Sequence, residues 1–533
     1  MKRCRVCPHS AVEYGEKVKS ISHRGQEENR LVRSKEVWWV AALTLVASAA
    51  LGMRLVGLGA EPFWLDEVCT RNFNPGTLSS VLHAYAADVH PPLYGILLHL
   101  WGTLAGASEQ ALRSYSTAFS IVGLLCAVLL TRDVTGNRWA ALAAGLMLAV
   151  NSLDIWYARE ARMYAQAACL TTMASWVLWR WLQRKDAAST PRCLAVAYGF
   201  LAALLLYTHY LASIVLFSQV LVAFVLFSAR RLWRDAAQLL GAAAAALASF
   251  VPWVIFVHRF RPSLYSATQV GWIPKPHLID VFGYLNHEFF LGFASAPGTA
   301  ADWFPVVTGG LLAVALVAAA STGPAPAGVP ARRTSEALAL LLWLALGPAL
   351  VAAAISHLWH PVYFRPRFSL FCLAPGVVAL VAMLAKVRPP LRTVLIATIT
   401  AFMATGAAWQ AASPTKQGLR ELRRLAVSFG EPEFALLLPS PNSILVHYYL
   451  PHARLQLSRE ELGARLRSTT PVIVWVCLKD GELPPPKSRE GELVSWLATT
   501  GPYRRLGNAD GFVVYELRAR ALPQDGSEEK RRS

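Results

Sequence analysis

The sequence predicts a mostly α-helical, polytopic membrane protein that carries a small α/β domain at its C-terminus. Of the 533 residues, 55% are hydrophobic and only 16% are charged. The mean hydropathy is +0.38, and long apolar runs recur as far as residue 412. A chain of this composition is too apolar for one soluble globule and long enough for many membrane spans.

A transmembrane helix needs about 20 mostly apolar residues, and on that basis we expect about eleven. They are predicted at residues 37–58, 115–130, 139–152, 165–182, 193–207, 211–228, 236–257, 304–320, 337–356, 368–384 and 394–412. Residues 91–107 are also apolar, but the run is short and begins with Pro-Pro, a natural helix start. We expect this run to form an interfacial helix in the first outer loop.

The distribution of Lys and Arg predicts the orientation of the chain. If residues 91–107 do not cross the membrane, one set of connecting segments always carries basic residues: 1–36, 131–138, 183–192, 229–234, 321–333 and 386–392. The positive-inside rule then places the N-terminus in the cytoplasm and the C-terminus outside. The expected location is the cytoplasmic (inner) membrane.

Four regions are predicted in total. Residues 1–36 are polar and expected to form a disordered cytoplasmic tail, and residues 37–412 form the transmembrane domain. Residues 413–522 combine helical periodicity at 415–429 and 490–499 with strand-like runs at 434–438, 471–478 and 511–517, which is typical of an extracytoplasmic α/β domain. Residues 523–533 are expected to be a disordered tail.

Composition also limits the partners. The net charge of +18 raises the possibility of nucleic-acid binding, but no compact basic face with stacking aromatics is visible, so we expect no nucleic-acid partner. The eight cysteines are scattered and form no disulfide framework. Cys4 and Cys7 form a lone CxxC without a second ligand pair, which favours incidental cysteines over a zinc site. A divalent metal is left open.

Residues 63–94 hold the main candidate site. Asp66 and Glu67 follow the first apolar run directly, and carboxylates beside a span indicate a functional site or a water-filled cavity. Asp66 is the candidate general base, and Glu67 either assists it or holds a neighbouring arginine. Glu160 is a second candidate acid that positions the acceptor or a metal, although it is equally suited to neutralising the arginines on either side of it.

Two outer segments carry arginines against the positive-inside rule. These are Arg159 and Arg162 in WYAREARMYA, and Arg365 and Arg367 in HPVYFRPRF. Basic residues on the outer side require an anionic partner, and a lipid phosphate is the obvious one; ordinary headgroup contact is the alternative.

Three further side chains are candidates for supporting the same cavity: His90, Tyr164 and His209. His90 is suited either to contacting phosphate or to capping the helix that follows it, and a lone histidine is often structural.

An enzyme on the outer face has no access to cytosolic nucleotide sugars, so its activated donor must arrive attached to a lipid. A sugar on a polyprenyl phosphate already has a good leaving group. The protein then has to deprotonate an acceptor hydroxyl and stabilise the departing phosphate. A carboxylate base among arginines meets both requirements.

Several motifs resemble one family of enzymes. FWLDE, HPPLYGILLHLW, SEQALRSYSTAFS, WYAREARMYA, YTHY and RPRFSLFCLAP occur in that order over residues 37–412. The layout resembles bacterial membrane glycosyltransferases related to protein O-mannosyltransferases and to the aminoarabinose transferase of lipid A, which share the C-type glycosyltransferase fold.

The resemblance implies transfer of a sugar, with inversion, from a polyprenyl-phosphate donor to a lipid, glycan or protein acceptor. It implies that Asp66 is the base, that Glu160 is the second acid, and that Arg367 matches the arginine of an Arg-Tyr pattern in which Phe368 here replaces the tyrosine. Neither the sugar nor the acceptor is specified.

Two other function classes suit a polytopic chain with charged loops. One is a transporter or flippase of a lipid-linked or anionic substrate, although transporters usually place charges near the midplane of repeated, interrupted spans. The other is an inactive scaffold or sensor that presents the outer domain.

Overall fold

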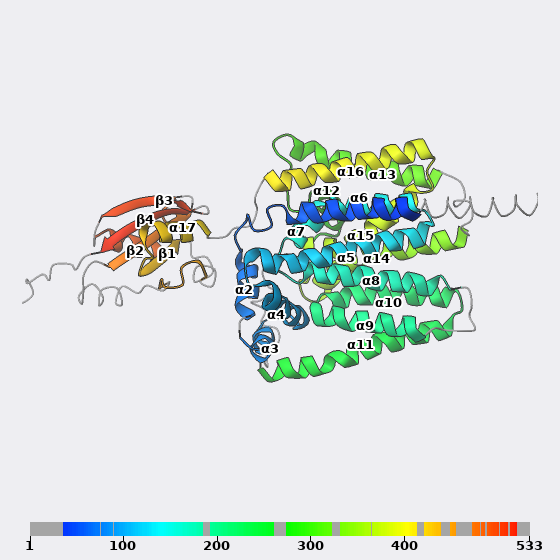
Figure 1. Ribbon diagram of the computed structural model, residues 1–533, viewed down its shortest axis with the longest axis horizontal. Coiled ribbons are helices and arrows are strands. Elements are labelled where there is room, and N and C mark those ends of the chain that lie inside the picture. Colours follow the sequence, from blue (N-terminus) through cyan, green and yellow to red (C-terminus); the bar gives the residue numbers. More distant parts are fainter. Residues whose placement is uncertain are drawn as a thin grey trace, which may run out of the picture.

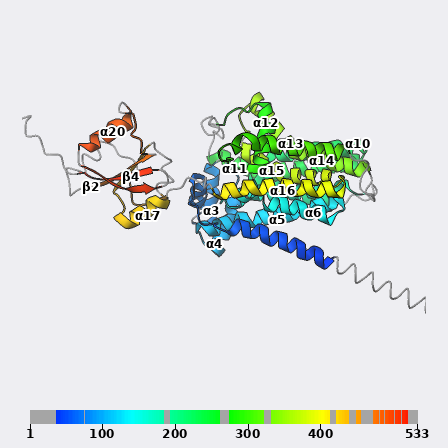
Figure 2. The ribbon, with the colours of Figure 1, turned by 90° about the horizontal axis from the view of Figure 1, so that it is seen from above.

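The structure is a computed structural model that describes residues 36–74, 76–88, 90–184, 192–260, 273–321, 331–363, 365–412, 420–438, 448–454, 472–479, 481–485, 488–499, 502–509 and 512–519. The predicted tails, including Cys4 and Cys7, lie outside these residues, apart from Glu36. Most of the described chain is helical, and long helices run side by side in one bundle, with a small sheet-containing unit beside one end of it (Figures 1 and 2).

The bundle contains helices at every position where a span is predicted. They are Glu36–Leu55, α5 (Glu109–Thr135), α6 (Arg138–Ala149), α8 (Tyr164–Leu182), α9 (Arg192–Thr208), α10 (Ala212–Ala229), α11 (Trp233–Phe260), α13 (Ala300–Ser321), α14 (Ala331–Leu358), α15 (Arg365–Leu384) and α16 (Pro389–Ala412). Helices α5 and α15 lie centrally, since each packs against several others, including α8.

The predicted count of eleven spans is not confirmed. Eight helices of the described chain are long and apolar enough to cross a membrane, or nine if the bent pair α6 and α7 (Ser152–Ala158) counts as one span. Helix α9 has only 17 residues. Helix α8 has 19 residues, but it contains polar side chains such as Gln166 and Arg180 that lower its hydropathy. Both helices nevertheless pack within the bundle (Figure 1).

Short helices gather at the end of the bundle nearest the sheet-containing unit (Figure 1). These are α2 (Leu65–Phe73), α3 (Leu78–Ala87) and α4 (Leu93–Ala105). Helix α4 covers the run beginning at Pro91 and has 13 residues, so it is about 20 Å long, well short of a hydrocarbon core of about 30 Å. Its length matches the predicted interfacial helix. Helix α12 (Leu278–Leu291) lies in the long loop before α13.

Local sequence explains where the central helices begin and end. Helix α5 starts after Ser108, whose hydroxyl accepts the N–H of Ala111, and stops at Gly136, which adopts a left-handed φ of 64°. Asn137 caps α6 and Asn151 caps α7 in the same way. The cap at Asn151 restarts the helix at an angle of 63° to α6, which sends the following residues across the end of the bundle.

The C-terminal unit, defined here as the described residues from 420 to 519, is an α/β fold. Its four strands lie in the order β1 (Phe434–Leu438), β2 (Val472–Lys479), β4 (Phe512–Ala519) and β3 (Tyr503–Ala509), with β1 parallel to β2 and the other pairs antiparallel. Helices α17 (Arg420–Phe429) and α20 (Arg489–Ala498) complete it. Three strands and both helices confirm the sequence prediction. Strand β3 was not predicted, because YRRLGNA lacks an alternating apolar pattern.

Candidate active site

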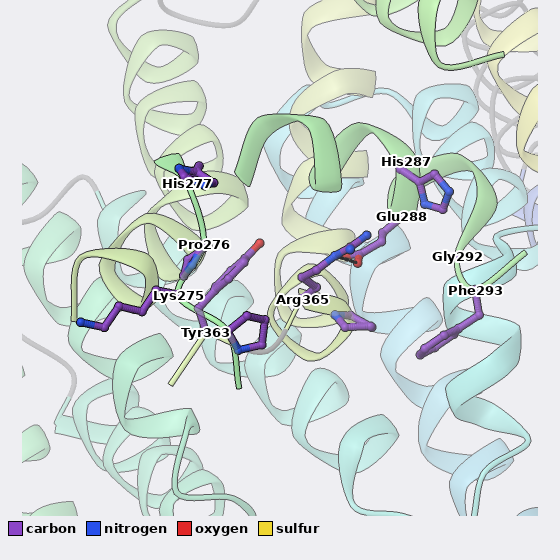
Figure 3. A pocket seen from close by; sticks show the side chains of 11 residues that line it. Lys275, Pro276, His277, His287, Glu288, Gly292, Phe293, Tyr363 and Arg365 are labelled. Carbon is purple, nitrogen blue, oxygen red and sulfur yellow. Dashed lines mark ion pairs between the residues drawn. The ribbon is translucent and has the colours of Figure 1, made fainter. Parts of the chain in front are cut away.

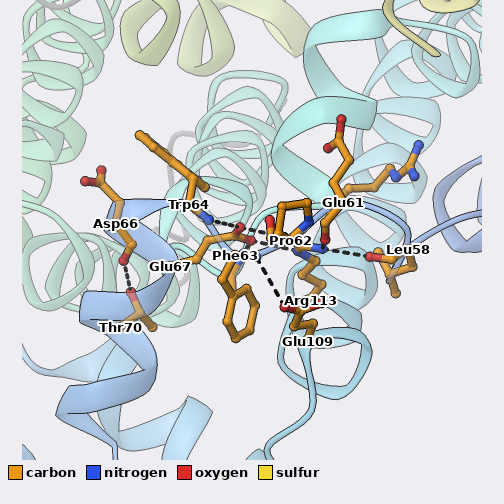
Figure 4. A network of polar contacts seen from close by, with 12 residues as sticks. Leu58, Glu61, Pro62, Phe63, Trp64, Asp66, Glu67, Thr70, Glu109 and Arg113 are labelled. Atoms are coloured by element: carbon orange, nitrogen blue, oxygen red, sulfur yellow. Dashed lines mark hydrogen bonds and ion pairs between the residues drawn. The ribbon is translucent and has the colours of Figure 1, made fainter. Parts of the chain in front are cut away.

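Helix α2 carries the two adjacent carboxylates at the end of the bundle. Asp66 and Glu67 both lie in its first turn, where the partial positive charge of the helix N-terminus stabilises anions. Successive helical residues point about 100° apart, so the two side chains face different neighbours (Figure 4). Glu67 is fully buried, whereas the Asp66 side chain is 24% exposed.

Glu67 is engaged by an arginine of α5. Arg113 donates from Nε to Glu67 Oε1 at 2.8 Å and from Nη2 to Oε2 at 2.6 Å, and Oε1 also accepts the backbone N–H of Ala161 at 2.8 Å. The remaining Arg113 donors reach the carbonyls of Leu58, Glu61 and Pro62 (Figure 4). Two roles were considered for Glu67: assisting Asp66 and binding a neighbouring arginine. These contacts match the second role.

Asp66 faces two other arginines. Its Oδ2 lies 3.9 Å from Nη2 of Arg162 and 3.8 Å from Nη2 of Arg367. Both distances exceed those of a direct hydrogen bond, so the two guanidinium groups place positive charge beside the carboxylate without bonding to it directly. Arg162 is instead fixed by donating to the carbonyl of Asp66 at 3.2 Å and to the hydroxyl of Thr70 at 3.0 Å.

His90 extends this cluster through Arg162. Its Nδ1 lies 2.7 Å from Asp88 Oδ2, and its Nε2 lies 3.4 Å from Nη2 of Arg162. Burial and the adjacent Arg162 lower the pKa of His90 below its ordinary value, although Asp88 opposes this shift. The imidazole is therefore neutral at pH 7, with Nδ1–H donating to Asp88 and Nε2 accepting from Arg162.

Tyr164 and His209 complete the cluster. The guanidinium carbon of Arg367 lies 4.8 Å from the centroid of the Tyr164 ring, a cation–π distance, and the rings of Tyr164 and His209 lie 5.6 Å apart. His209 also lies 5.6 Å from His90. Burial, followed by His90 and the two arginines, holds the pKa of His209 well below its ordinary value.

Three buried polar atoms of this cluster have no hydrogen-bond partner among the described residues. They are Nε of Arg162, the hydroxyl of Tyr164 and Nε2 of His209. His209 Nδ1 accepts the N–H of Leu211 at 3.0 Å, so Nε2 carries the proton. Buried polar groups are nearly always satisfied in folded proteins, and unsatisfied donors of this kind suit a bound ligand or water.

Two predicted residues, Arg159 and Arg365, contact groups outside this cluster, whereas Glu160 lies beside it. Arg159 donates to the carbonyl of Gly57 at 2.7 Å, on the side of the loop that follows the first helix. Glu160 is buried and lies within electrostatic reach of Tyr157 and Tyr164. Arg365 lies two residues before Arg367, and its Nε is 3.6 Å from Glu288 Oε1. Arg365 and Arg367 therefore face opposite sides of the α15 N-terminus.

A pocket of about 450 Å³ that contains several ionisable side chains opens beside Arg365 (Figure 3). Its ionisable lining comes from the loop before α12, from α12 and from the start of α15: Lys275, His277, His287, Glu288, Tyr363 and Arg365. Burial raises the pKa of Glu288 to about 7, against the opposing effects of Ser369 and Arg365. Ser369 donates a hydrogen bond to Glu288.

An apolar cavity of about 310 Å³ lies between α12, α13, α14 and α15. Phe289, Leu316, Leu342 and Leu380 contribute to its lining, and Ser369, the hydrogen-bond donor to Glu288, lies at its wall. The pocket at Arg365 and this apolar cavity thus adjoin the first turns of α15. In the described part of the chain, no group of three or more His, Cys, Asp and Glu side chains has metal-binding geometry.

Sequence reasoning missed three residues that organise these sites. Arg113 was part of a quoted motif without a role, and only its contact with Glu67 reveals one. Asp88 lies two residues before His90, a spacing that suits a carboxylate orienting an imidazole. Glu288 lies in NHEFF, and nothing in that sequence distinguishes it from a surface residue.

Comparison with known proteins supports the expected resemblance. Residues 89–256 match the sequence family described as dolichyl-phosphate-mannose-protein mannosyltransferase. This segment contains His90, Arg162, Tyr164 and His209, four of the six side chains of the Asp66 cluster. No curated protein sequence matches the chain.

Several solved structures are similar at low identity. ArnT from Cupriavidus metallidurans, solved with undecaprenyl phosphate, is 16% identical with a TM-score of 0.47, covering 92% of this chain and 99% of that one. The S. cerevisiae Pmt1–Pmt2 protein O-mannosyltransferase is 16% identical with a TM-score of 0.34, covering 42% and 34%. The Archaeoglobus fulgidus oligosaccharyltransferase is 13% identical with a TM-score of 0.43, covering 79% and 64%. These low values by themselves establish neither a substrate nor a reaction for this chain.

The match over residues 89–256 falls on the segment that supplies most of the polar cluster. The chain therefore resembles the protein mannosyltransferase family over this segment, and the match indicates a membrane glycosyltransferase.

Proposed function

We propose that the protein transfers a glycosyl group from a polyprenyl-phosphate-linked sugar to a lipid, glycan or protein acceptor on the outer face of the cytoplasmic membrane. The observation that carries this proposal is the position of Asp66 between Arg162 and Arg367, with distances of 3.9 and 3.8 Å. One carboxylate and two guanidinium groups supply a proton acceptor and a site for developing negative charge.

In the proposed reaction, Asp66 accepts the proton of an acceptor hydroxyl. The acceptor oxygen forms a bond to the anomeric carbon from the face opposite the phosphate, while the bond between that carbon and the phosphate oxygen breaks. The bonding electrons leave with the polyprenyl phosphate, and the configuration at the anomeric carbon inverts. Arg162 and Arg367 stabilise the charge that develops, and Nε2–H of His209 and the hydroxyl of Tyr164 are available to substrate oxygens.

The two cavities support a location for the donor. Arg365, beside Lys275 in the pocket of about 450 Å³, and Arg367, beside Asp66, flank the N-terminus of α15. A phosphate in front of this N-terminus is proposed to contact both arginines. The apolar cavity that adjoins Ser369 suits the first isoprene units of the lipid. Glu160 is proposed to help position the acceptor, and Arg159 to contact lipid headgroups near the start of the first loop.

The test uses purified full-length protein and a radiolabelled polyprenyl-phosphate sugar. Asp66→Asn is expected to lower turnover by about 10²- to 10⁴-fold, the usual contribution of a general base, while donor binding is retained. Asp302→Asn is the matched control, because Asp302 also lies in a first helical turn but is exposed. Full activity of Asp66→Asn would remove Asp66 as the base. Movement of intact donor across a bilayer without cleavage would favour a flippase.

A further inference from the structure

Phe63, three residues before Asp66, has its ring and both of its backbone polar groups in contact with other side chains. Its ring is fully buried, and the guanidinium carbon of Arg113 lies 5.1 Å from the ring centroid. Its backbone N–H donates to Glu109 Oε1 at 3.3 Å, and its carbonyl accepts from the hydroxyl of Tyr449 at 3.2 Å. Both backbone groups of one residue are therefore tied to side chains from distant parts of the chain.

The C-terminal unit supplies several of these contacts. The Tyr449 hydroxyl also lies 3.3 Å from Glu109 Oε1, and the ring of Tyr448 lies 6.0 Å from that of Phe63. Tyr448 is also 5.9 Å from the guanidinium carbon of Arg71, near the end of α2. The unit thus contacts the segment before α2 and the last turn of α2 itself.

Arg420, the first residue of α17, adds a second attachment. It donates to the carbonyl of Ala60 at 2.8 Å and to that of Glu61 at 3.0 Å, and it forms an ion pair with Glu109. Charge-assisted bonds from one guanidinium to two consecutive carbonyls fix the direction of the backbone as well as its position. Contacts of the C-terminal unit therefore converge on residues 60–63 and on Glu109.

Helix α2 transmits the position of this segment to Asp66. It has nine residues, and a helix this short has little stability of its own, so its direction depends on what holds its ends. The start is held by Phe63 and by the pair of Glu67 with Arg113. A displacement of residues 60–63 therefore moves Asp66 relative to Arg367, which belongs to α15.

We propose that the C-terminal unit positions the catalytic carboxylate, with Tyr449 and Arg420 acting as positioning residues for Asp66. The role assigned to Asp66 rests on the proposed function; the docking itself rests only on the contacts given above. Neither residue touches the Asp66 cluster, so their effect on the reaction is exerted through the backbone of residues 60–63.

The test uses the full-length protein with Tyr449→Phe and Arg420→Gln. A shift of the base by about 1 Å costs up to about 100-fold in rate, so we expect kcat to fall about 10- to 100-fold, while KM for the donor stays within about twofold. Hydrogen exchange of peptides covering residues 60–73 is expected to accelerate. Arg420→Lys keeps the positive charge but cannot bond both carbonyls at once as the guanidinium does. Its kcat is expected to lie between those of Arg420→Gln and the wild-type protein.

The C-terminal unit offers matched controls. Tyr503 also donates its hydroxyl to a backbone carbonyl, that of Val494, and Arg423 also pairs with a glutamate, Glu431; both contacts lie within the unit. Tyr503→Phe and Arg423→Gln are expected to leave kcat and the exchange of residues 60–73 unchanged. Glu109→Gln changes the residue outside the unit that both Tyr449 and Arg420 contact. It is expected to give the same loss of kcat and the same faster exchange as Tyr449→Phe, and it replaces that variant in the test if Tyr449→Phe is unstable.

Unchanged exchange of residues 60–73 in Tyr449→Phe, Arg420→Gln and Glu109→Gln would overturn the proposal, as would equal effects in the controls. Accelerated exchange without loss of kcat would show docking but refute positioning. If the wild-type protein transfers no sugar, the proposed function fails, and unchanged exchange would then refute the docking independently.

Discussion

Asp66 and Glu67 are neighbours in sequence with different environments, and the difference is a matter of burial. Glu67 is fully buried and receives both arms of Arg113. Removing one partner of a buried pair leaves an uncompensated charge, which costs about 3–5 kcal/mol. We therefore expect Arg113→Met to lower the free energy of unfolding by about that amount, measured by denaturant titration in detergent.

The exposed pair of Arg138 with Glu36 provides the comparison for Arg113. Their side chains are 33% and 50% exposed, and exposed ion pairs contribute about 0–1 kcal/mol. Arg138→Met is expected to change the free energy of unfolding by no more than that. Equal losses in the two variants would show that Glu67 does not depend on Arg113.

Glu288 provides a pH-dependent prediction at the same scale. Burial, the largest cause, raises its pKa from 4.5 to about 7, so the carboxyl is mostly neutral below pH 7 and charged above it. When it ionises, it offsets the charge of Arg365, 3.6 Å away. If Arg365 binds the donor phosphate as proposed, KM for the donor rises as pH increases through about 7, by about threefold to tenfold.

The measurement is KM for the donor between about pH 6 and about pH 8, a range centred on the Glu288 pKa. Glu288→Gln removes the titrating group and is expected to keep KM low throughout. Glu421→Gln, at an exposed carboxylate of α17, is expected to retain the wild-type rise. An unchanged rise in Glu288→Gln would assign the titration to another group.

At the scale of elements, the bend between α6 and α7 is held by one buried arginine. Arg54 is fully buried and donates to the carbonyls of Leu148 and Ala149 at 3.1 Å each, at the end of α6. It also pairs with Asp154 of α7 at 2.5 Å. The same side chain therefore bonds carbonyls at the C-terminal end of α6 and links them to Asp154 of α7.

Arg54→Met is expected to lower the free energy of unfolding by about 3–5 kcal/mol, because it leaves the Asp154 carboxylate with its hydrogen bond from Ser120 but without its compensating positive charge. Helix α7 leads directly to Arg162, so hydrogen exchange of residues 148–163 is also expected to accelerate. Arg180→Met is the control, since Arg180 is 59% exposed and lies 3.7 Å from Asp133. Slow exchange of residues 148–163 in Arg54→Met would contradict this account.

The predictability of each element followed its sequence pattern. Strands β1, β2 and β4 are continuous apolar or alternating runs, and they were predicted within a few residues. Strand β3 is an edge strand with adjacent arginines, Arg504 and Arg505, and an irregularity before Gly507, so no period of two is visible. Helix α12 was missed as well, because it lies within a long loop whose apolar residues also suit a buried loop.

For the whole molecule, the sequence predicted which side chains gather in one region better than which of them contact each other. Six of the ten predicted side chains, from Asp66 to Arg367, are joined through ion-pair, hydrogen-bond or ring contacts. All ten are expected on the outer face because of the distribution of Lys and Arg among the connecting segments and the number of spans between those segments. The separation of Arg365 from Arg367, and of Glu67 from Asp66, depends on helical side-chain directions and on the partners Glu288 and Arg113, which a single sequence does not specify.

The contacts of the cluster also constrain the topology. Arg162 precedes α8 and His209 follows α9, yet both reach His90, so α8 and α9 must together return the chain to the same side. This holds whether both helices cross the membrane or neither does, so α8 and α9 do not change the parity of the span count. The parity depends on the bent pair α6 and α7: counted as one span it gives an odd total, which would place the termini on opposite sides, whereas eight spans would place them on the same side.

Accessibility to a membrane-impermeant thiol reagent in intact cells tests this topology. Thr103→Cys, at an exposed position in the last turn of α4, and Glu482→Cys, in the C-terminal unit, are both expected to react. Trp233→Cys, at the exposed start of α11, is expected to be protected until the membrane is opened. The basic residues near Trp233 predict a cytoplasmic position for it. Protection of Glu482→Cys with reaction of Thr103→Cys would separate the C-terminal unit from Asp66 by a membrane, which the contact of Tyr449 with Phe63 forbids. That result would overturn the span parity and the positioning role of the C-terminal unit together.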